Sequence, residues 1–186
     1  EVGLTFLHVT HDQEEAMDMA DTVAVMNKGQ IEQMGAPEAL YERPKTSFVA
    51  KFLGQSNIFV GQVAESSANS LSIDVAGSKI SVPKNRAEKQ DGKIAIGVRP
   101  EKAHFHREAP KADANLNILG PGEIKDIRFT GVSNQYLIEI PNVGDVIVFA
   151  QNVGISPVVE LGEKVWVSFK VEHAFGLADL PAGDEH

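Results

Sequence analysis

His11 is the residue of this sequence best placed for chemistry, because it separates a strand-like run from a helix-like one. Residues 4–9 read LTFLHV, and Thr10-His11-Asp12 follows directly. In open α/β sheets, ligands bind in the crevice just beyond the carboxyl ends of the strands. An imidazole there can donate a hydrogen bond to charge that develops on a transferring phosphoryl group. Taken alone, a histidine in this position more often has a structural hydrogen-bonding role.

The neighbours of His11 have simpler explanations. His8 lies three residues earlier. Side chains at that spacing on an extended strand point to opposite faces, so the pair does not predict a metal site. Asp12 precedes Glu15 by three residues, which is the spacing of a helix capping box, and Glu14 adds a second acidic group to the first turn. We interpret these carboxylates as capping and solvated groups rather than as a catalytic base or magnesium ligands.

The elements that would position His11 alternate between strand and helix over the first 55 residues. The run 4–9 shows little polar alternation, which is typical of a strand buried on both faces. Turn residues at 27–29 predict a hairpin, and proline suits the first turn of a helix. The expected order is a strand at 4–9, a helix over 13–19, a hairpin of strands 22–26 and 30–34, a helix from Pro37 that ends before Pro44, and a short helix FVAKFL capped by Thr46 or Ser47.

From residue 56 to about 180 the pattern is all-β, so we place a domain boundary near residue 55. Helical periodicity disappears, and short apolar runs alternate with Gly- and Pro-rich turns, as in a small barrel or sandwich. The halves 57–106 and 115–175 are similar in length but show no convincing sequence repeat. The expected strands are 58–63, 70–75, 79–82, 93–98, 123–129, 135–140, 146–150 and 164–171.

Composition excludes several classes of protein. The chain has 186 residues, of which 42% are hydrophobic and 23% charged, as in a globular protein. The net charge of −9, without a run of Lys or Arg, argues against a nucleic-acid partner. The absence of cysteine excludes disulfides and thiolate metal sites, and we predict no metal site. No stretch approaches the ~20 apolar residues of a membrane-spanning helix.

Three ordered segments, VTHDQEEAM, ADTVAVMNKGQIEQMGAPEALYERP and FVAKFLG, carry a family resemblance. They make residues 4–54 similar to the end of the nucleotide-binding domain of ATP-binding cassette (ABC) transporter ATPases. The resemblance implies that residues 1–55 are an α/β fragment of that domain. It also implies that His11 is the switch-loop histidine, a catalytic residue that hydrogen-bonds the γ-phosphate of ATP and helps to position the attacking water.

Residues 56–180 resemble the OB-fold-like accessory module of importer ATPases that is called the TOBE domain. The resemblance rests on NIF at 57–59, IGVRPE at 96–101, FTG at 129–131 and QYLI at 135–138. The pattern is most similar to spermidine/putrescine importers, with iron, phosphonate and sugar importers as near relatives. We interpret Arg99 and Glu101 as parts of a turn fixed by Pro100, with charges that pair across the domain, rather than as ligand-binding groups.

Other parts that ATP hydrolysis needs have no match in the sequence. There is no G-x-x-x-x-G-K-[ST] segment, no apolar strand that ends in Asp-Glu, and no Leu-Ser-Gly-Gly-Gln signature. The first residues, EVGL, resemble the middle of a protein. We therefore expect a C-terminal fragment that does not hydrolyse ATP by itself. ATP and Mg²⁺ are expected only in the full-length parent.

The resemblance also implies partners and a location. These are a homodimer, transmembrane permease subunits, a small-molecule regulator of the β-domain, and a cytoplasmic position at the inner face of the plasma membrane. Strands without their full sheet would expose apolar faces and an unpaired edge, which also favours self-association. The alternative is a stand-alone ligand-binding or regulatory TOBE module, in which residues 1–54 are only a scaffold without an ATPase role.

Overall fold

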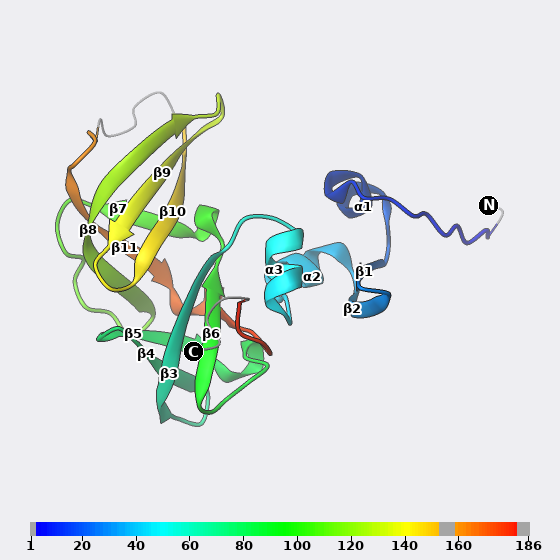
Figure 1. The fold of residues 1–186 in the computed structure, drawn as a ribbon, viewed down its shortest axis with the longest axis horizontal. Helices are drawn as coiled ribbons and strands as arrows, with labels where there is room; N and C mark the ends of the chain where they lie inside the picture. The colour runs from blue at the N-terminus through cyan, green and yellow to red at the C-terminus, as the bar shows by residue number, and fades with distance from the viewer. Residues whose placement is uncertain (1–2, 153–158, 182–186) are drawn as a thin grey trace.

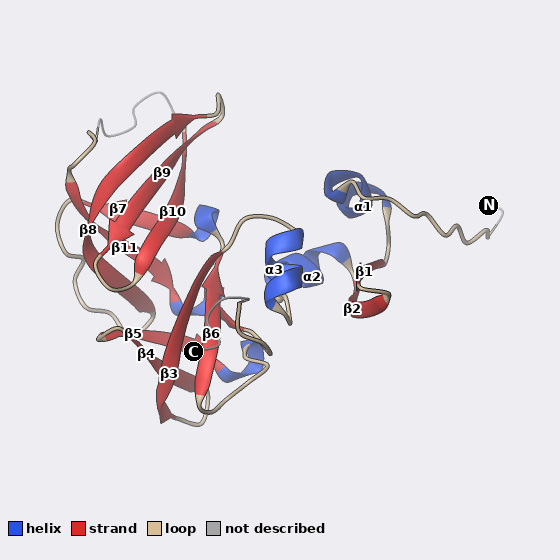
Figure 2. Ribbon diagram, viewed as in Figure 1, coloured by secondary structure: helices blue, strands red, loops and turns tan. Residues whose placement is uncertain are grey.

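The computed structural model describes residues 3–152 and 159–181, which form a small N-terminal part (residues 3–56) and a larger β part (residues 57–181) (Figures 1 and 2). Helices α2 and α3 lie between the β part and the remaining N-terminal elements (Figure 1). The N-terminal elements are α1 (Gln13–Met19), β1 (Val23–Asn27), β2 (Gln30–Gly35), α2 (Pro37–Glu42) and α3 (Ser47–Phe52). The predicted helices and hairpin are therefore confirmed.

The helices begin where the sequence places capping groups. Asp12 accepts hydrogen bonds from the backbone N–H groups of Glu14 and Glu15, at 2.9 and 3.1 Å, so the start predicted for α1 is confirmed. The hydroxyl of Thr46 accepts from the N–H of Val49 at the start of α3. Helix α2 has no side-chain cap and begins instead with a proline at its first position.

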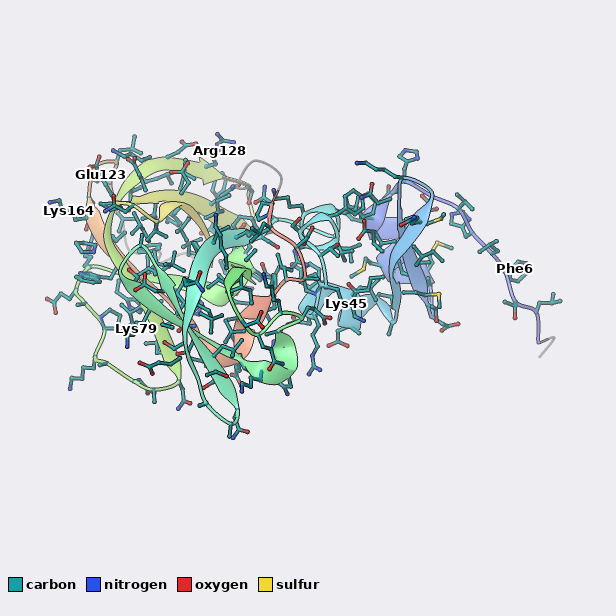
Figure 3. All side chains as sticks on the ribbon, turned by 60° about the horizontal axis from the view of Figure 1, so that its bottom comes forward. Phe6, Lys45, Lys79, Glu123, Arg128 and Lys164 are labelled. Carbon is teal, nitrogen blue, oxygen red and sulfur yellow. The ribbon has the colours of Figure 1, made fainter. Side chains whose placement is uncertain are left out.

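The strand predicted at residues 4–9 is wrong for this chain. The segment is extended, but it pairs with no other strand among the residues that the structure describes. It leads away from the rest of the molecule, with Phe6 near its end (Figure 3). Its apolar side chains, Leu4, Phe6, Leu7 and Val9, are between 66% and 93% exposed. An apolar run signals a need for burial, but a strand also needs a neighbour for its backbone groups, and this chain supplies none there.

A small core holds the N-terminal elements together. Val23 and Val25 of β1 pack with Leu40 of α2 and Val49 of α3, and side chains of α1 border the cluster. Helices α2 and α3 therefore belong to the core of the N-terminal part as well as facing the β part. Because these two helices contact both parts, the boundary that we predicted near residue 55 does not separate two independent sets of contacts.

Two five-stranded sheets make up the β part, and its predicted all-β character is confirmed. The first sheet has the order β12-β6-β3-β4-β5 and the second the order β7-β11-β8-β9-β10, with all neighbours antiparallel. The strands are β3 (Asn57–Ser66), β4 (Ser70–Val75), β5 (Ser78–Pro83), β6 (Lys93–Val98), β7 (Ala103–His106), β8 (Leu116–Phe129), β9 (Ser133–Ile140), β10 (Gly144–Gln151), β11 (Lys164–Lys170) and β12 (Phe175–Gly176). Three 3₁₀ turns are η1 (Lys84–Arg86), η2 (Pro100–Lys102) and η3 (Val171–His173).

The two sheets repeat one topology. Each copy has three consecutive strands, a fourth strand beside the first, a 3₁₀ turn, and a last strand that crosses to the other sheet. Thus β7 pairs with β11, and β12 pairs with β6. The structure therefore contains an internal repeat that the sequence did not reveal. Strand β7, strand β12 and the first half of β8 are the elements that the sequence analysis missed.

Two buried asparagines join the sheets in the same way. The side-chain amide of Asn57 donates to the carbonyl oxygen of Ile147 at 2.8 Å, and its oxygen accepts from the Ile147 N–H at 2.7 Å. Asn117 makes the equivalent pair with the backbone of Ser81, at 2.9 and 2.7 Å. Each amide replaces a backbone peptide group across the gap between the first strand of one sheet and the edge strand of the other. The pair of contacts closes the two sheets around one apolar core.

Two glycines occupy corresponding close approaches and support the repeat. A Cβ at Gly61 would lie 2.3 Å from the carbonyl oxygen of Asp74, and one at Gly122 would lie 2.9 Å from that of Glu139. Both are shorter than a normal contact, so the first and second strands of each copy pack closely only with glycine there.

Replacing Asn57 or Asn117 with Ala should lower the free energy of unfolding by about 2–4 kcal/mol, because it leaves a buried N–H and C=O without partners. Denaturant unfolding, followed by the fluorescence of the single tryptophan, measures this. Asn69→Ala, in the exposed turn between β3 and β4, is the control and should change stability by less than about 0.5 kcal/mol. Equal effects in all three variants would contradict the proposed closure.

Candidate functional site

His11 lies in the turn directly before α1, and its side chain is exposed. The turn is held by its neighbours: the N–H of Asp12 donates to the hydroxyl of Thr10 at 3.0 Å, while the Asp12 carboxylate caps the helix. Among the described residues, no hydrogen bond or ion pair is recorded for the His11 ring. The ligand-facing role of His11 stays a prediction, and the imidazole is exposed to solvent.

The other ionisable groups near this turn have local partners. His8 Nε2 lies 3.3 Å from the carboxylate of Glu15. Hydrogen bonds from Thr10 and then His8 lower the pKa of Glu15, which is partly exposed. The described residues contain no group of three or more His, Asp or Glu side chains arranged to hold a metal ion.

The most strongly organised polar site is the junction between the two parts, and Arg99 is at its centre. Arg99 ends the IGVR segment after β6 and is only 2% exposed. Its guanidinium donates to the carbonyl oxygens of Tyr41 and Ala50, both at 2.8 Å. It also donates to the carbonyl oxygen of Gln55 at 3.1 Å and to the hydroxyl of Ser56 at 2.7 Å. These groups satisfy a buried charge without any carboxylate.

The expectation that the Arg99 charge pairs with an acidic group is therefore wrong. The carbonyl groups of Tyr41 and Ala50 lie in the last turns of α2 and α3, where helix carbonyls lack partners within the helix. The C-terminal end of a helix also carries partial negative charge, which stabilises a cation there. The guanidinium further lies 4.0 Å from the centre of the Tyr41 ring, a cation–π contact. Burial lowers the pKa of Arg99, yet an arginine side chain stays protonated in proteins.

Glu101 meets the N-terminal part through Tyr41 rather than through Arg99. The Tyr41 hydroxyl donates to the Glu101 carboxylate at 2.8 Å. Burial and then this hydrogen bond raise the pKa of Tyr41 to about 12, because ionisation would place a phenolate beside a carboxylate. The hydroxyl therefore remains a donor over the whole physiological range.

A second arginine extends the junction. Arg86 donates to the carbonyl oxygen of Glu42 at the end of α2 and to that of Ala174. The Glu42 carboxylate lies 3.3 Å from the ammonium group of Lys102. The β part thus holds the end of α2 with cations from two different segments, η1 and η2.

The C-terminal segment completes the junction beside α3. Ser47 donates to the Asp179 carboxylate through both its N–H and its hydroxyl, at 2.6 and 2.8 Å. The N–H of Ala178 donates to the carbonyl oxygen of Lys45, which lies between the two parts (Figure 3). Ala50 packs into a small apolar cluster with Phe175 of β12. Sequence analysis selected Arg99 and Glu101 but missed their partners. Those of Arg99 are mainly backbone carbonyls, which carry no sequence signal, and the Tyr41 hydroxyl that meets Glu101 lies 60 residues away in the sequence.

Two comparisons describe relatives of this chain. Residues 96–177 match the TOBE domain family. The spermidine/putrescine import ATP-binding protein PotA of Thermobifida fusca is 39% identical over 178 residues, covering 95% of this chain and 46% of the relative. The protein of the same name from Acidothermus cellulolyticus is 35% identical over 186 residues, covering 99% of this chain and 48% of the relative. The chain thus spans about half the length of these curated relatives.

Among solved structures, the cytoplasmic molybdate-binding protein ModG, in a form with molybdate bound, resembles the fold. The TM-score is 0.53 at 14% sequence identity, and the match covers 64% of this chain and 94% of that one. At this identity the likeness concerns the fold alone.

Residues 96–177 of the β part therefore match a TOBE domain, and the fold resembles that of the molybdate-binding protein. The chain as a whole is similar, along nearly its entire length, to ATP-binding subunits of spermidine/putrescine importers. The resemblance predicted from the sequence is confirmed. Among the described residues, no helix is long and apolar enough to cross a membrane.

Replacing Arg99 with Met should loosen α2 and α3 from the β part by about 2–3 kcal/mol, because their terminal carbonyl groups lose buried donors. Hydrogen exchange should accelerate in residues 40–55 more than in β8 or β9. Arg99→Lys should restore only part of the protection, since an ammonium group cannot fork between several carbonyl groups.

The control for this experiment is Arg128→Met, which removes an exposed arginine on β8 that pairs with Asp126 on the same strand (Figure 3). It should leave exchange in residues 40–55 unchanged. If Arg99→Met accelerates exchange uniformly over both parts, Arg99 stabilises the whole fold and not the junction.

Proposed function

We propose that this chain is the C-terminal part of the ATP-hydrolysing subunit of an ABC importer for polyamines. The observation that carries the proposal is the similarity to spermidine/putrescine import ATP-binding proteins over 95–99% of the chain. In this proposal, residues 1–55 are the end of the nucleotide-binding domain. Residues 56–180 are a regulatory and dimerisation domain.

His11 is the one residue of the chain proposed to act in ATP hydrolysis. Its ring is exposed, and Asp12 fixes the turn that carries it by capping α1. An imidazole in such a turn can donate a hydrogen bond to the γ-phosphate and stabilise charge that develops during transfer. The sequence has no phosphate-cradling loop, so ATP and Mg²⁺ would be held chiefly by other residues of the parent protein.

The exposed apolar segment 4–9 fits the same proposal. An apolar run with unpaired backbone groups and side chains up to 93% exposed is ready to add to a sheet. In the parent protein it would pair as a strand of the nucleotide-binding sheet, with His11 just beyond its carboxyl end. This arrangement would restore the placement that the sequence predicted and that the isolated chain does not form.

The location and partners follow from the proposed role. An energy-coupling subunit would work in the cytoplasm, at the inner face of the plasma membrane, against transmembrane permease subunits. A small-molecule regulator of the β part is a further proposed partner. Calorimetry with spermidine tests this regulator, and the absence of heat at about millimolar ligand would remove it from the proposal.

A chimera tests the catalytic role. The N-terminal portion of the Thermobifida fusca relative, joined to this chain at Glu1, should hydrolyse ATP. His11→Ala should lower kcat by about 10²–10³-fold, the usual effect of losing one donor to the transition state. His8→Ala, three residues away and paired with Glu15, is the matched control and should change kcat by less than about threefold.

Equal losses in the two histidine variants would show a structural effect on the turn. An active chimera that tolerates His11→Ala would contradict the catalytic role and favour the alternative, a TOBE module whose N-terminal residues are a scaffold.

Self-association is proposed because the chain exposes large apolar side chains on residues 4–9 and also on the hairpin, at Met26, Ile31 and Met34. Light scattering should give about 40 kDa, twice the 20.1 kDa of one chain. Adding charge with Phe6→Glu and Leu7→Glu together should shift the mass towards the monomer, whereas Lys79→Glu on the β part should not. A wild-type mass near 20 kDa would rule the dimer out.

A further inference from the structure

The internal repeat gives the η2 turn a counterpart in η3, and the two turns differ in what covers them. The residue before η2 is Arg99, with φ −71° and ψ 140°. The residue before η3 is Lys170, with φ −68° and ψ 144°. Each turn is followed by a buried alanine, Ala103 or Ala174, whose N–H bonds to the first residue of the turn. The side chains of Arg99 and Lys170 therefore leave equivalent positions in the same direction.

The charges on the two turns also follow the same order. Glu101 and Lys102 of η2 correspond to Glu172 and His173 of η3. Each turn thus presents a fixed cation, then a carboxylate, then a second basic side chain. The residues at the start of each copy correspond as well: Gln55 and Ser56 lie just before β3, and Asn115 and Leu116 lie at the start of β8.

The ends of α2 and α3 contact the η2 turn and bury Arg99, while Glu101 stays exposed. Arg99 binds helix-terminal carbonyl groups, Glu101 accepts from the Tyr41 hydroxyl, and Lys102 pairs with Glu42. All three residues therefore contact α2, and Arg99 also contacts α3.

Lys170 has no such cover, although His173 of η3 is half-buried. Lys170 and Glu172 are exposed and pair with each other at 3.2 Å. Beside them is an open depression of about 590 Å³, whose walls also include Asp113, Asn115 and Pro83. No helix precedes the first strand of this copy: residues 107–115, which include Pro110, take an irregular path. By the correspondence of the two copies, the depression takes the position beside η3 that α2 and α3 take beside η2.

We propose that the η3 face, formed by Asn115, Leu116 and residues 170–173, is a docking site for the C-terminal end of a helix from a partner protein. The helix would present free terminal carbonyl groups to the ammonium group of Lys170. A hydroxyl donor, as in tyrosine, would reach the carboxylate of Glu172. The contacts on η2 are the template for this partner, and the proposal does not depend on the transport function.

A peptide of residues 36–55 is the probe, because this segment contacts the η2 turn in the structure. It should be added unlabelled to the isotope-labelled full chain, with amide chemical shifts recorded by NMR. The expected result is saturable shifts at Asn115, Leu116 and residues 170–173. Shifts at Arg99 instead, or none at up to about 1 mM peptide, would overturn the proposal.

Two variants test the contacts. Lys170→Glu in the chain should weaken binding by about tenfold or more, and a Tyr41→Phe peptide should bind several-fold more weakly. Lys164→Glu is the matched control, since it makes the same charge change on the same strand at its other, exposed end (Figure 3). An equal loss in the two chain variants would reduce the interaction to nonspecific charge attraction and overturn the proposed site.

Discussion

The arrangement of this molecule depends on one buried guanidinium group held by backbone carbonyls. Arg99 brings a full positive charge to the boundary between two parts of the chain, and the ends of α2 and α3 supply the oxygen atoms that compensate it. A charge in that position is costly unless every donor has a partner. Arg99 thus ties both helices to the β part, and contacts of Arg86, Lys102, Glu101 and Asp179 surround it.

This constraint explains why helices α2 and α3 cannot be assigned to one part alone. Leu40 and Val49 pack into the N-terminal core, whereas Ala50 packs against Phe175 of the β part. A displacement of the N-terminal part would have to move α2 and α3 against one of these two clusters. In the proposed ATPase subunit, α2 and α3 would transmit movements between the nucleotide-binding domain and the TOBE domain, in either direction.

Local chemistry predicted much of this structure, and long-range pairing explains what was missed. Asp12, Thr46 and Pro37 mark helix starts because capping acts within a few residues. The segment 4–9 has the composition of a buried strand, but composition does not state whether a neighbouring strand exists. The repeat was not recognised in the sequence because the two copies share few residues. It is preserved instead in contacts with the backbone, such as those of Asn57 and Asn117. At the junction, Arg99 was identifiable, but its carbonyl partners were not.

The exchange of last strands between the two copies of the β part has a consequence for how such a fold can arise. Each copy leaves its own sheet short of one strand and supplies the missing strand to the other, as β7 and β12 show. One copy alone would therefore have an open sheet edge and a dangling strand. Two identical copies would complete each other as separate chains. Duplication and fusion of the gene for such a symmetric pair would give this single polypeptide. Later divergence of the two copies would explain why α2 and α3 contact η2 but no helices contact Lys170 beside η3.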